Sequence, residues 1–348
     1  MPERIEVATP ATTAGAVVPV APTSQQPAPP LSGGMSRAGT EPLISSKPPA
    51  KRLLTDLGVL GVAVVWGSTY VAMQWSGQFI SVPSFLFLRF AIGALTITAL
   101  SFKVWRGLTR EEVSLGVLFG CLLFGILFLE TAGVRYTLAS NAGFLISLSV
   151  MLVPLIERFA LRVRISAGVY PVTVLSLMGC ALLTLDHGFS VRSGDLIILA
   201  AAVIRATQIV LFGSRAKGRE VSLLRVTAVE LWVVALGGLV LSLGRPVRSW
   251  HEVISLPGDA WLVVVYLAVA CTAFAFLTQL HAARVSSPTR VGLVLSTEPF
   301  FAAVFAVMLL DEHLGPVQLI GGGLVLASAY LGRWVEARRP PAARGSAG

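Results

Sequence analysis

The stretch from 291 to 310, VGLVLSTEPFFAAVFAVMLL, holds one acidic residue, Glu298, in an otherwise uncharged apolar run. A run of about twenty such residues is long enough to cross a bilayer as a helix. At about 1.5 Å per residue from Pro288, Glu298 would lie roughly 15 Å deep, near the midplane. A charge at that depth usually marks function, so we expect Glu298 to line a cavity and bind a cationic group or a proton. The alternative is a purely structural pairing or hydrogen bond.

The residues around Glu298 predict a local break in this helix. Pro299 cannot donate a hydrogen bond to the carbonyl of Leu295, and the freed carbonyl needs another partner in lipid. Ser296 and Thr297 add two hydroxyls in the same turn and are predicted to line the cavity. Pro154, in LSVMLVPLIERF, predicts a similar break in an earlier run.

Among the other charged residues inside apolar runs, Arg89, Arg205 and Glu230 lie well away from the run ends. Arg205 is a candidate partner for Glu298, as a gating ion pair or as a static structural pair; alternatively, Arg205 holds a substrate carboxylate while Glu298 holds its amine. Arg89 is too deep for snorkelling to explain it and needs an interior partner. Glu230 is expected to pair across helices, with Arg205 as one candidate. Glu130, near the end of its run, is expected to be interfacial.

The segment WGSTY, from Trp66 to Tyr70, gives its run a small, polar and aromatic middle. Trp66 and Tyr70 are four residues apart and share a helix face, which suits a cavity wall. The alternative is a core face whose hydroxyls bond to the preceding turn. Further polar residues predicted to line the cavity are Ser68, Thr69, Gln74 and Asn141.

The composition is that of a membrane protein. Of 348 residues, 55% are hydrophobic and 13% are charged, against roughly 25% charged in soluble domains. The net charge of +9 does not indicate nucleic-acid binding, because most basic residues lie in short gaps between apolar runs. The three cysteines lie in apolar runs without metal-ligand spacing, so no metal site and no cofactor is expected.

Apolar runs of membrane-spanning length recur along the chain. We predict an all-α protein with ten transmembrane helices at 56–76, 82–102, 113–132, 137–157, 166–185, 194–214, 222–243, 260–280, 288–310 and 315–335. With the N-terminus inside, Lys and Arg are far commoner in the inner segments; the outer segments hold only Arg135, Arg192, Arg245 and Arg248. Both termini are therefore predicted to be cytoplasmic, and the Arg- and Ala-rich composition favours a bacterial cytoplasmic (inner) membrane.

The two halves of the chain resemble each other. DLGVLGVAVVWGSTY at 56–70 aligns with DLIILAAAVIRATQI at 195–209, which makes Arg205 equivalent to Trp66. Five helices per half is an odd number, so the halves would be inverted repeats, an arrangement typical of secondary transporters. The predicted parts are a disordered tail at 1–50, repeats at 51–190 and 191–336, and a tail at 337–348.

These features together resemble the EamA family of the drug/metabolite transporter superfamily. The resemblance covers about 55–335 and is carried by WGSTY, Arg89, YTLASNAGFL and STEPFFAAVFAVMLLDEHLGPVQLIGGGL in that order. It implies secondary transport of a small metabolite, amino acid or drug-like solute, often export, by alternating access.

The expected partners are a small-molecule substrate and the lipid bilayer, with protons as a candidate coupling ion and with no nucleic acid. The protein is expected to be a monomer or homodimer and not an enzyme. Two other classes are weighed against transport: a membrane-embedded enzyme and a non-transporting scaffold or sensor. No nucleophile elbow, HExxH motif or phosphate-binding loop is present in the sequence.

Overall fold

The computed structural model describes residues 49–160, 162, 168–184, 192–215, 220–244, 246–285 and 288–337. They belong to one compact unit, and all of their regular secondary structure is helical. The predicted tails at 1–50 and 337–348 lie almost wholly outside the described residues. The helices are α1 (Pro49–Ser76), α2 (Val82–Leu100), α3 (Arg110–Gly133), α4 (Ala139–Ser147), α5 (Ser149–Ala160), α6 (Val169–Thr184), α7 (Ser193–Arg215), α8 (Leu223–Leu243), α9 (Pro246–Ile254), α10 (Gly258–Ala268), α11 (Ala275–Val285), α12 (Pro288–Leu295), α13 (Glu298–Leu310) and α14 (Pro316–Ala337).

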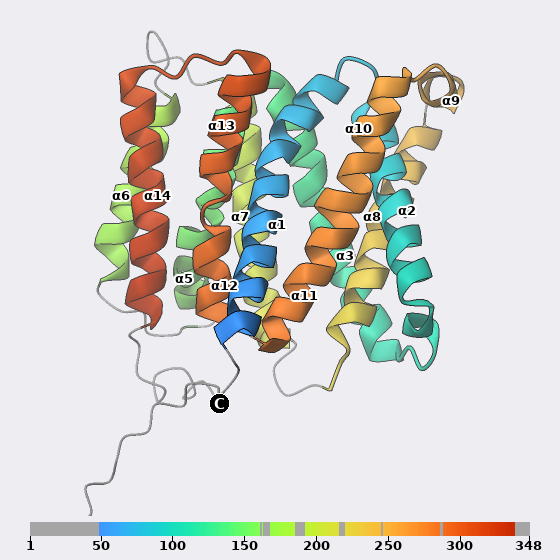
Figure 1. Ribbon diagram of the computed structural model, residues 1–348, viewed down its shortest axis with the longest axis horizontal. Helices are drawn as coiled ribbons and strands as arrows, with labels where there is room; N and C mark the ends of the chain where they lie inside the picture. Colours follow the sequence, from blue (N-terminus) through green and yellow to red (C-terminus); the bar gives the residue numbers. More distant parts are fainter. Residues whose placement is uncertain are drawn as a thin grey trace, which may run out of the picture. The chain divides into compact units, whose positions relative to one another are not determined.

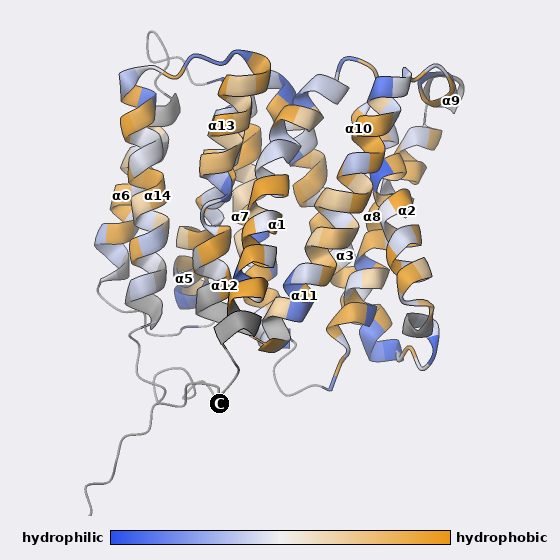
Figure 2. Cartoon of the chain, in the orientation of Figure 1, coloured by the Kyte–Doolittle hydropathy of each residue, from blue (hydrophilic) through white to orange (hydrophobic). Residues whose placement is uncertain are grey.

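The long helices run side by side between two edges of the molecule (Figure 1). α1 begins and α14 ends at the lower edge, and the connection from α13 to α14 lies at the upper edge. Apolar residues extend along the helices, while hydrophilic residues gather mainly toward the two ends (Figure 2). This distribution is the one that a bundle immersed in lipid requires.

Every predicted apolar run coincides with helix in the described residues, but not every helix is of full spanning length. Seven stretches there are long and apolar enough to cross a membrane: Leu53–Ser76, Val82–Leu100, Arg110–Tyr136, Ala139–Ala160, Ser193–Arg215, Leu223–Leu243 and Gly258–Ala282. Three further apolar helices are shorter: Tyr170–Gly179, Glu298–Leu310 and Pro316–Gly332. The chain is thus an integral membrane protein, while ten crossings remain a prediction.

Two pairs of helices are short because each is one apolar run interrupted in the middle. α12 stops at Leu295 and α13 begins at Glu298, directly before Pro299, as the proline predicts. The other interruption lies at Leu148, between α4 and α5. Pro154, where a break was predicted, instead lies inside α5, one to two turns after it. The local helix therefore tolerates the missing donor at Pro154.

Both interrupted runs end in the same unusual backbone conformation. Asp311, after α13, has a φ of 53°, and Arg162, after α5, has a φ of 54°. Left-handed backbone at a residue other than glycine is uncommon and is used here to end a helix. The corresponding runs of the two halves are therefore terminated alike.

A short amphipathic helix, α9, was not predicted from the sequence. It lies at the upper right of the molecule and follows α8 and precedes α10 in the chain (Figure 1). The Glu252 side chain of α9 accepts a hydrogen bond at 3.0 Å from the backbone N–H of Ser81, the residue before α2. That N–H belongs to the first turn of a helix, where the backbone needs an outside acceptor.

α1 and α13 approach each other closely at Gly67. A Cβ atom placed there would lie 2.6 Å from the Phe301 Cβ and 2.8 Å from the Ala302 backbone nitrogen. Only glycine allows this distance without moving one of the helices. Gly61, on the same helix, has nothing within 4 Å of such a Cβ.

We predict that Gly67→Ala lowers the stability of the protein by about 1–3 kcal/mol, because the added methyl group overpacks the α1–α13 contact. The matched control is Gly61→Ala, which adds the same methyl group to the same helix in open space. Thermal unfolding of both variants in detergent measures the effect. Equal melting temperatures for the two variants would contradict the close contact.

Candidate functional site

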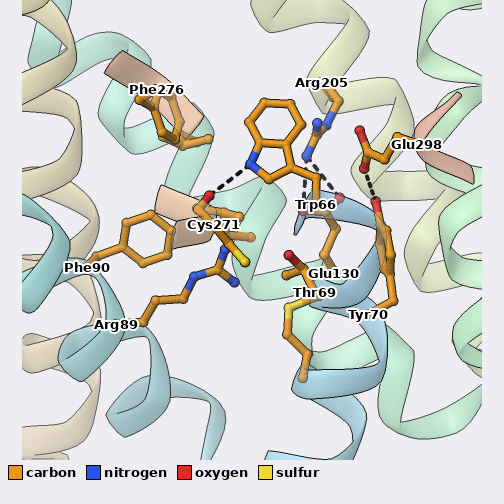
Figure 3. A pocket seen from close by; sticks show the side chains of 13 residues that line it. Trp66, Thr69, Tyr70, Arg89, Phe90, Glu130, Arg205, Cys271, Phe276 and Glu298 are labelled. Atoms are coloured by element: carbon orange, nitrogen blue, oxygen red, sulfur yellow. Dashed lines mark hydrogen bonds and ion pairs between the residues drawn. The ribbon is translucent and has the colours of Figure 1, made fainter. Parts of the chain in front are cut away.

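A cavity of about 80 Å³ lies inside the bundle (Figure 3). It brings together six of the residues predicted from the sequence: Trp66, Thr69, Tyr70, Arg89, Arg205 and Glu298. Its other lining residues were not predicted as site residues: Met73, Phe90, Leu123, Leu127, Glu130, Cys271 and Phe276. The lining comes from both halves of the chain, so segments distant in sequence must pack together to form the cavity.

Helical periodicity explains which residues of α1 and α3 reach the cavity. On α1 they are 66, 69, 70 and 73, and on α3 they are 123, 127 and 130. Residues three, four and seven apart share one helix face. The WGSTY segment therefore presents its tryptophan, threonine and tyrosine to the cavity. Ser68, between them, points elsewhere: its Oγ lies 2.8 Å from the Tyr266 hydroxyl.

The strongest interaction in the cavity joins Arg205 of α7 to Glu130 of α3. Arg205 Nη2 donates to both carboxylate oxygens of Glu130, at 2.9 and 3.1 Å. Glu130 is 3% exposed and so is not interfacial as expected. The reason is that the helical stretch continues to Tyr136, beyond the predicted end at 132, which leaves Glu130 deeper in the bundle.

Glu298 is held by a tyrosine rather than by the predicted arginine. The Tyr70 hydroxyl donates to Glu298 Oε1 at 2.8 Å. Glu298 is also the first residue of α13, where unpaired backbone N–H groups favour a negative charge. Arg205, its candidate partner, is bound to Glu130 instead.

Trp66 connects the first half of the chain to a distorted turn in the second. The segment η3 (Val269–Phe274), between α10 and α11, is a π-helix. Within it, the Cys271 carbonyl accepts a hydrogen bond at 2.8 Å from the Trp66 Nε1–H. Single π turns inside α-helices occur frequently at functional sites. Here the π turn places Cys271 in the cavity wall, a position that the sequence did not predict.

The remaining predicted site residues lie outside the cavity lining. Gln74 Nε2 donates to the Thr137 carbonyl at 3.2 Å, and Thr297 Oγ1 donates to the Val294 carbonyl at 2.7 Å. Asn141 is buried on α4, and Ser296 lies in the interruption before α13. Glu230 lies on α8, and its candidate partner Arg205 is engaged elsewhere. Their positions favour structural roles in helix packing and in the break.

The geometry defines a helical membrane protein with a charged, aromatic-lined cavity formed by both halves of its chain. The sequence pattern described as the EamA-like transporter family matches residues 53–185 and again 192–333. The chain therefore belongs to the EamA-like transporter family and contains its domain twice.

Curated relatives agree with this assignment. An uncharacterised transporter of Archaeoglobus fulgidus is 26% identical over 281 residues, covering 81% of this chain and 86% of that protein. The uncharacterised transporter YoaV of Bacillus subtilis is 22% identical over 302 residues, covering 81% of this chain and 98% of that protein. A crystal structure at 19% identity shares the fold, with a TM-score of 0.55 over 82% of this chain and 98% of that one.

We predict that Glu130→Gln destabilises the protein by at most about 3–5 kcal/mol, because it leaves the partly buried charge of Arg205 without its partner. Glu130→Gln combined with Arg205→Gln should recover much of that loss, since neither charge then remains. Thermal unfolding of the single and double variants in detergent provides the measurement. If the loss of stability in the double variant equals the sum of the losses in the two single variants, the stabilities of Glu130 and Arg205 are not coupled.

Proposed function

We propose that this protein is a secondary transporter that moves a small solute across the membrane by alternating access, with the solute bound in the central cavity. The observation that carries the proposal is the cavity itself, which combines two guanidinium groups, two carboxyl groups and aromatic side chains inside a membrane bundle. Charged residues at membrane depth mark substrate and ion pathways. Membership in a transporter family supports the same conclusion.

The proposed arrangement is two inverted five-helix repeats. The family domain occurs twice, and two apolar runs are interrupted in their middle and ended by left-handed residues. Trp66 and Arg205, which the repeat alignment makes equivalent, both line the cavity. Interrupted helices at the interface of such repeats form substrate sites in known secondary transporters. Both termini would then be cytoplasmic, with the protein in a bacterial inner membrane.

Alternating access would use the interrupted helices as moving parts. α13 packs against both α1 and α4, so it contacts an uninterrupted helix and the other interrupted run. The Tyr70–Glu298 hydrogen bond crosses the α1–α13 contact beside the cavity. Displacement of α13 would break this bond and free both groups for solute or a proton. We propose net export, driven by the solute gradient or by protons.

The first test is counterflow in proteoliposomes. Vesicles containing the protein and preloaded with a cell metabolite extract should accumulate at least one labelled solute, chemically unchanged, while protein-free vesicles should not. A chemically altered solute would indicate an enzyme, and the absence of exchange across a broad metabolite panel would indicate a scaffold. The solutes in this panel are chosen by comparing the metabolites that leave cells with the protein and cells without it.

We predict that Glu298→Gln abolishes proton-driven accumulation of the solute but leaves exchange largely intact, because an amide cannot take up and release the coupled proton. Glu220→Gln, which neutralises an exposed carboxylate between α7 and α8, serves as the matched control. Accumulation and exchange are measured in the same proteoliposomes. Proton-driven accumulation that survives in Glu298→Gln would remove Glu298 from the coupling role.

A further inference from the structure

Arg89 is a buried cation that has no anionic partner among the residues that the structure describes. It lies on α2 and is 4% exposed. Its Nε donates to the Thr272 hydroxyl at 3.3 Å, and its guanidinium carbon lies 5.2 Å from the centre of the Phe90 ring. Its Nη1 is buried without a hydrogen-bond partner, and Arg89 makes no ion pair with any residue that the structure describes.

The other charged groups of the cavity are already engaged. Arg205 is bound to Glu130 through both carboxylate oxygens, and Glu298 accepts a hydrogen bond from Tyr70. Figure 3 shows Arg89 and Glu298 on opposite sides of Trp66. The guanidinium of Arg89 is therefore the charge in the cavity that lacks a strong partner among the described residues.

The surrounding backbone holds Arg89 in this position. Gly93, one turn along α2 on the same face, faces η3: a Cβ there would lie 3.0 Å from Thr272 Cγ2 and 3.2 Å from the Ala268 carbonyl oxygen. The Thr272 hydroxyl donates to the Leu267 carbonyl at 3.0 Å, which leaves its oxygen free to accept from Arg89. The close packing and the π turn thus hold the Nε side of the guanidinium in place, while Nη1 makes no hydrogen bond with any described residue.

A carboxylate is the group that would complete this site. A buried charge is costly unless it is paired and hydrogen-bonded. The planar guanidinium presents parallel N–H donors that match the two oxygens of a carboxylate. Trp66, Phe90 and Phe276 offer apolar and aromatic surface beside it. At about 80 Å³, the cavity is smaller than the ~150 Å³ engineered cavity that admits benzene. It therefore favours a carboxylate whose apolar part is small.

We propose that Arg89 binds the carboxylate of the transported solute and that this solute is a small organic anion with an apolar body. The inference rests on the proposed transport function and names the substrate class of the same cavity. Arg205, whose Nε is also buried without a hydrogen-bond partner among the described residues, is the weaker candidate for carboxylate binding, because its charge is already paired with Glu130.

The test is a comparison of acids with their neutral amides. Binding of acetate, propionate, isobutyrate and isovalerate to the purified full-length protein in detergent is measured by calorimetry, alongside the four corresponding primary amides. Wild type should bind at least one acid about tenfold to a hundredfold more tightly than its amide, the range expected for a hydrogen bond to a charged group. Arg89→Gln should abolish this preference, and Arg89→Lys should keep part of it because the charge remains.

Arg135→Gln is the matched control, since Arg135 is a partly buried arginine that donates to the Ile80 carbonyl and does not line the cavity. It should retain the preference for acids. Equal binding of acids and amides by wild type, no acid binding at all, or a preference that survives in Arg89→Gln would each overturn the proposal. If Arg89→Gln does not fold, the wild-type comparison and Arg89→Lys still decide.

Counterflow separates this inference from the proposed function. Exchange of an acid from this panel supports both. Exchange restricted to neutral or cationic solutes overturns the role of Arg89 and leaves the transport proposal standing. Failure of every solute in a broad metabolite panel overturns the transport proposal itself.

Discussion

Burial of charge inside a membrane bundle is the constraint on which the rest of this structure depends. Lipid supplies no hydrogen bonds, so a guanidinium or carboxylate at this depth is tolerated only with a partner or a polar cavity. Glu130 and Arg205 meet the requirement by pairing across α3 and α7. Their pairing fixes the cavity wall and removes both groups from competition for a solute. The chemistry left to the cavity then depends on Arg89, Glu298 and Tyr70.

The position of a residue along an apolar run does not determine its partner. Counting along an apolar run places Glu298 and Arg205 at similar depth, which is why they were expected to pair. Pairing also depends on the direction in which each side chain points around its helix, and that follows from the packing of helices far apart in sequence. Tyr70 reaches Glu298 because Gly67 lets α1 approach α13. The face of α1 was predictable from residue spacing, whereas the identity of the facing helix was not.

Local irregularities were predictable only where one residue dictates them. Pro299 lacks a backbone donor, and the helix breaks just before it. No residue type marks the interruption at Leu148 or the π turn at η3. They nevertheless matter for the site, since η3 supplies the carbonyl that binds Trp66 and the hydroxyl that holds Arg89. A site built on distorted backbone is therefore harder to predict than the bundle around it.

The candidate proton-binding group and the candidate anion-binding group of the cavity are separated in a way that suits coupled transport. Glu298 begins the half-helix α13, whereas Arg89 is fixed to α2 and η3. A solute anion on Arg89 and a proton on Glu298 would occupy different atoms, so neither excludes the other by direct competition. Their coupling would instead run through α1, because its Tyr70 binds Glu298 and its Trp66 binds η3 next to Arg89. A shift of α13 relative to α1 would alter the environment of both groups at once, which is the property that an alternating cavity needs.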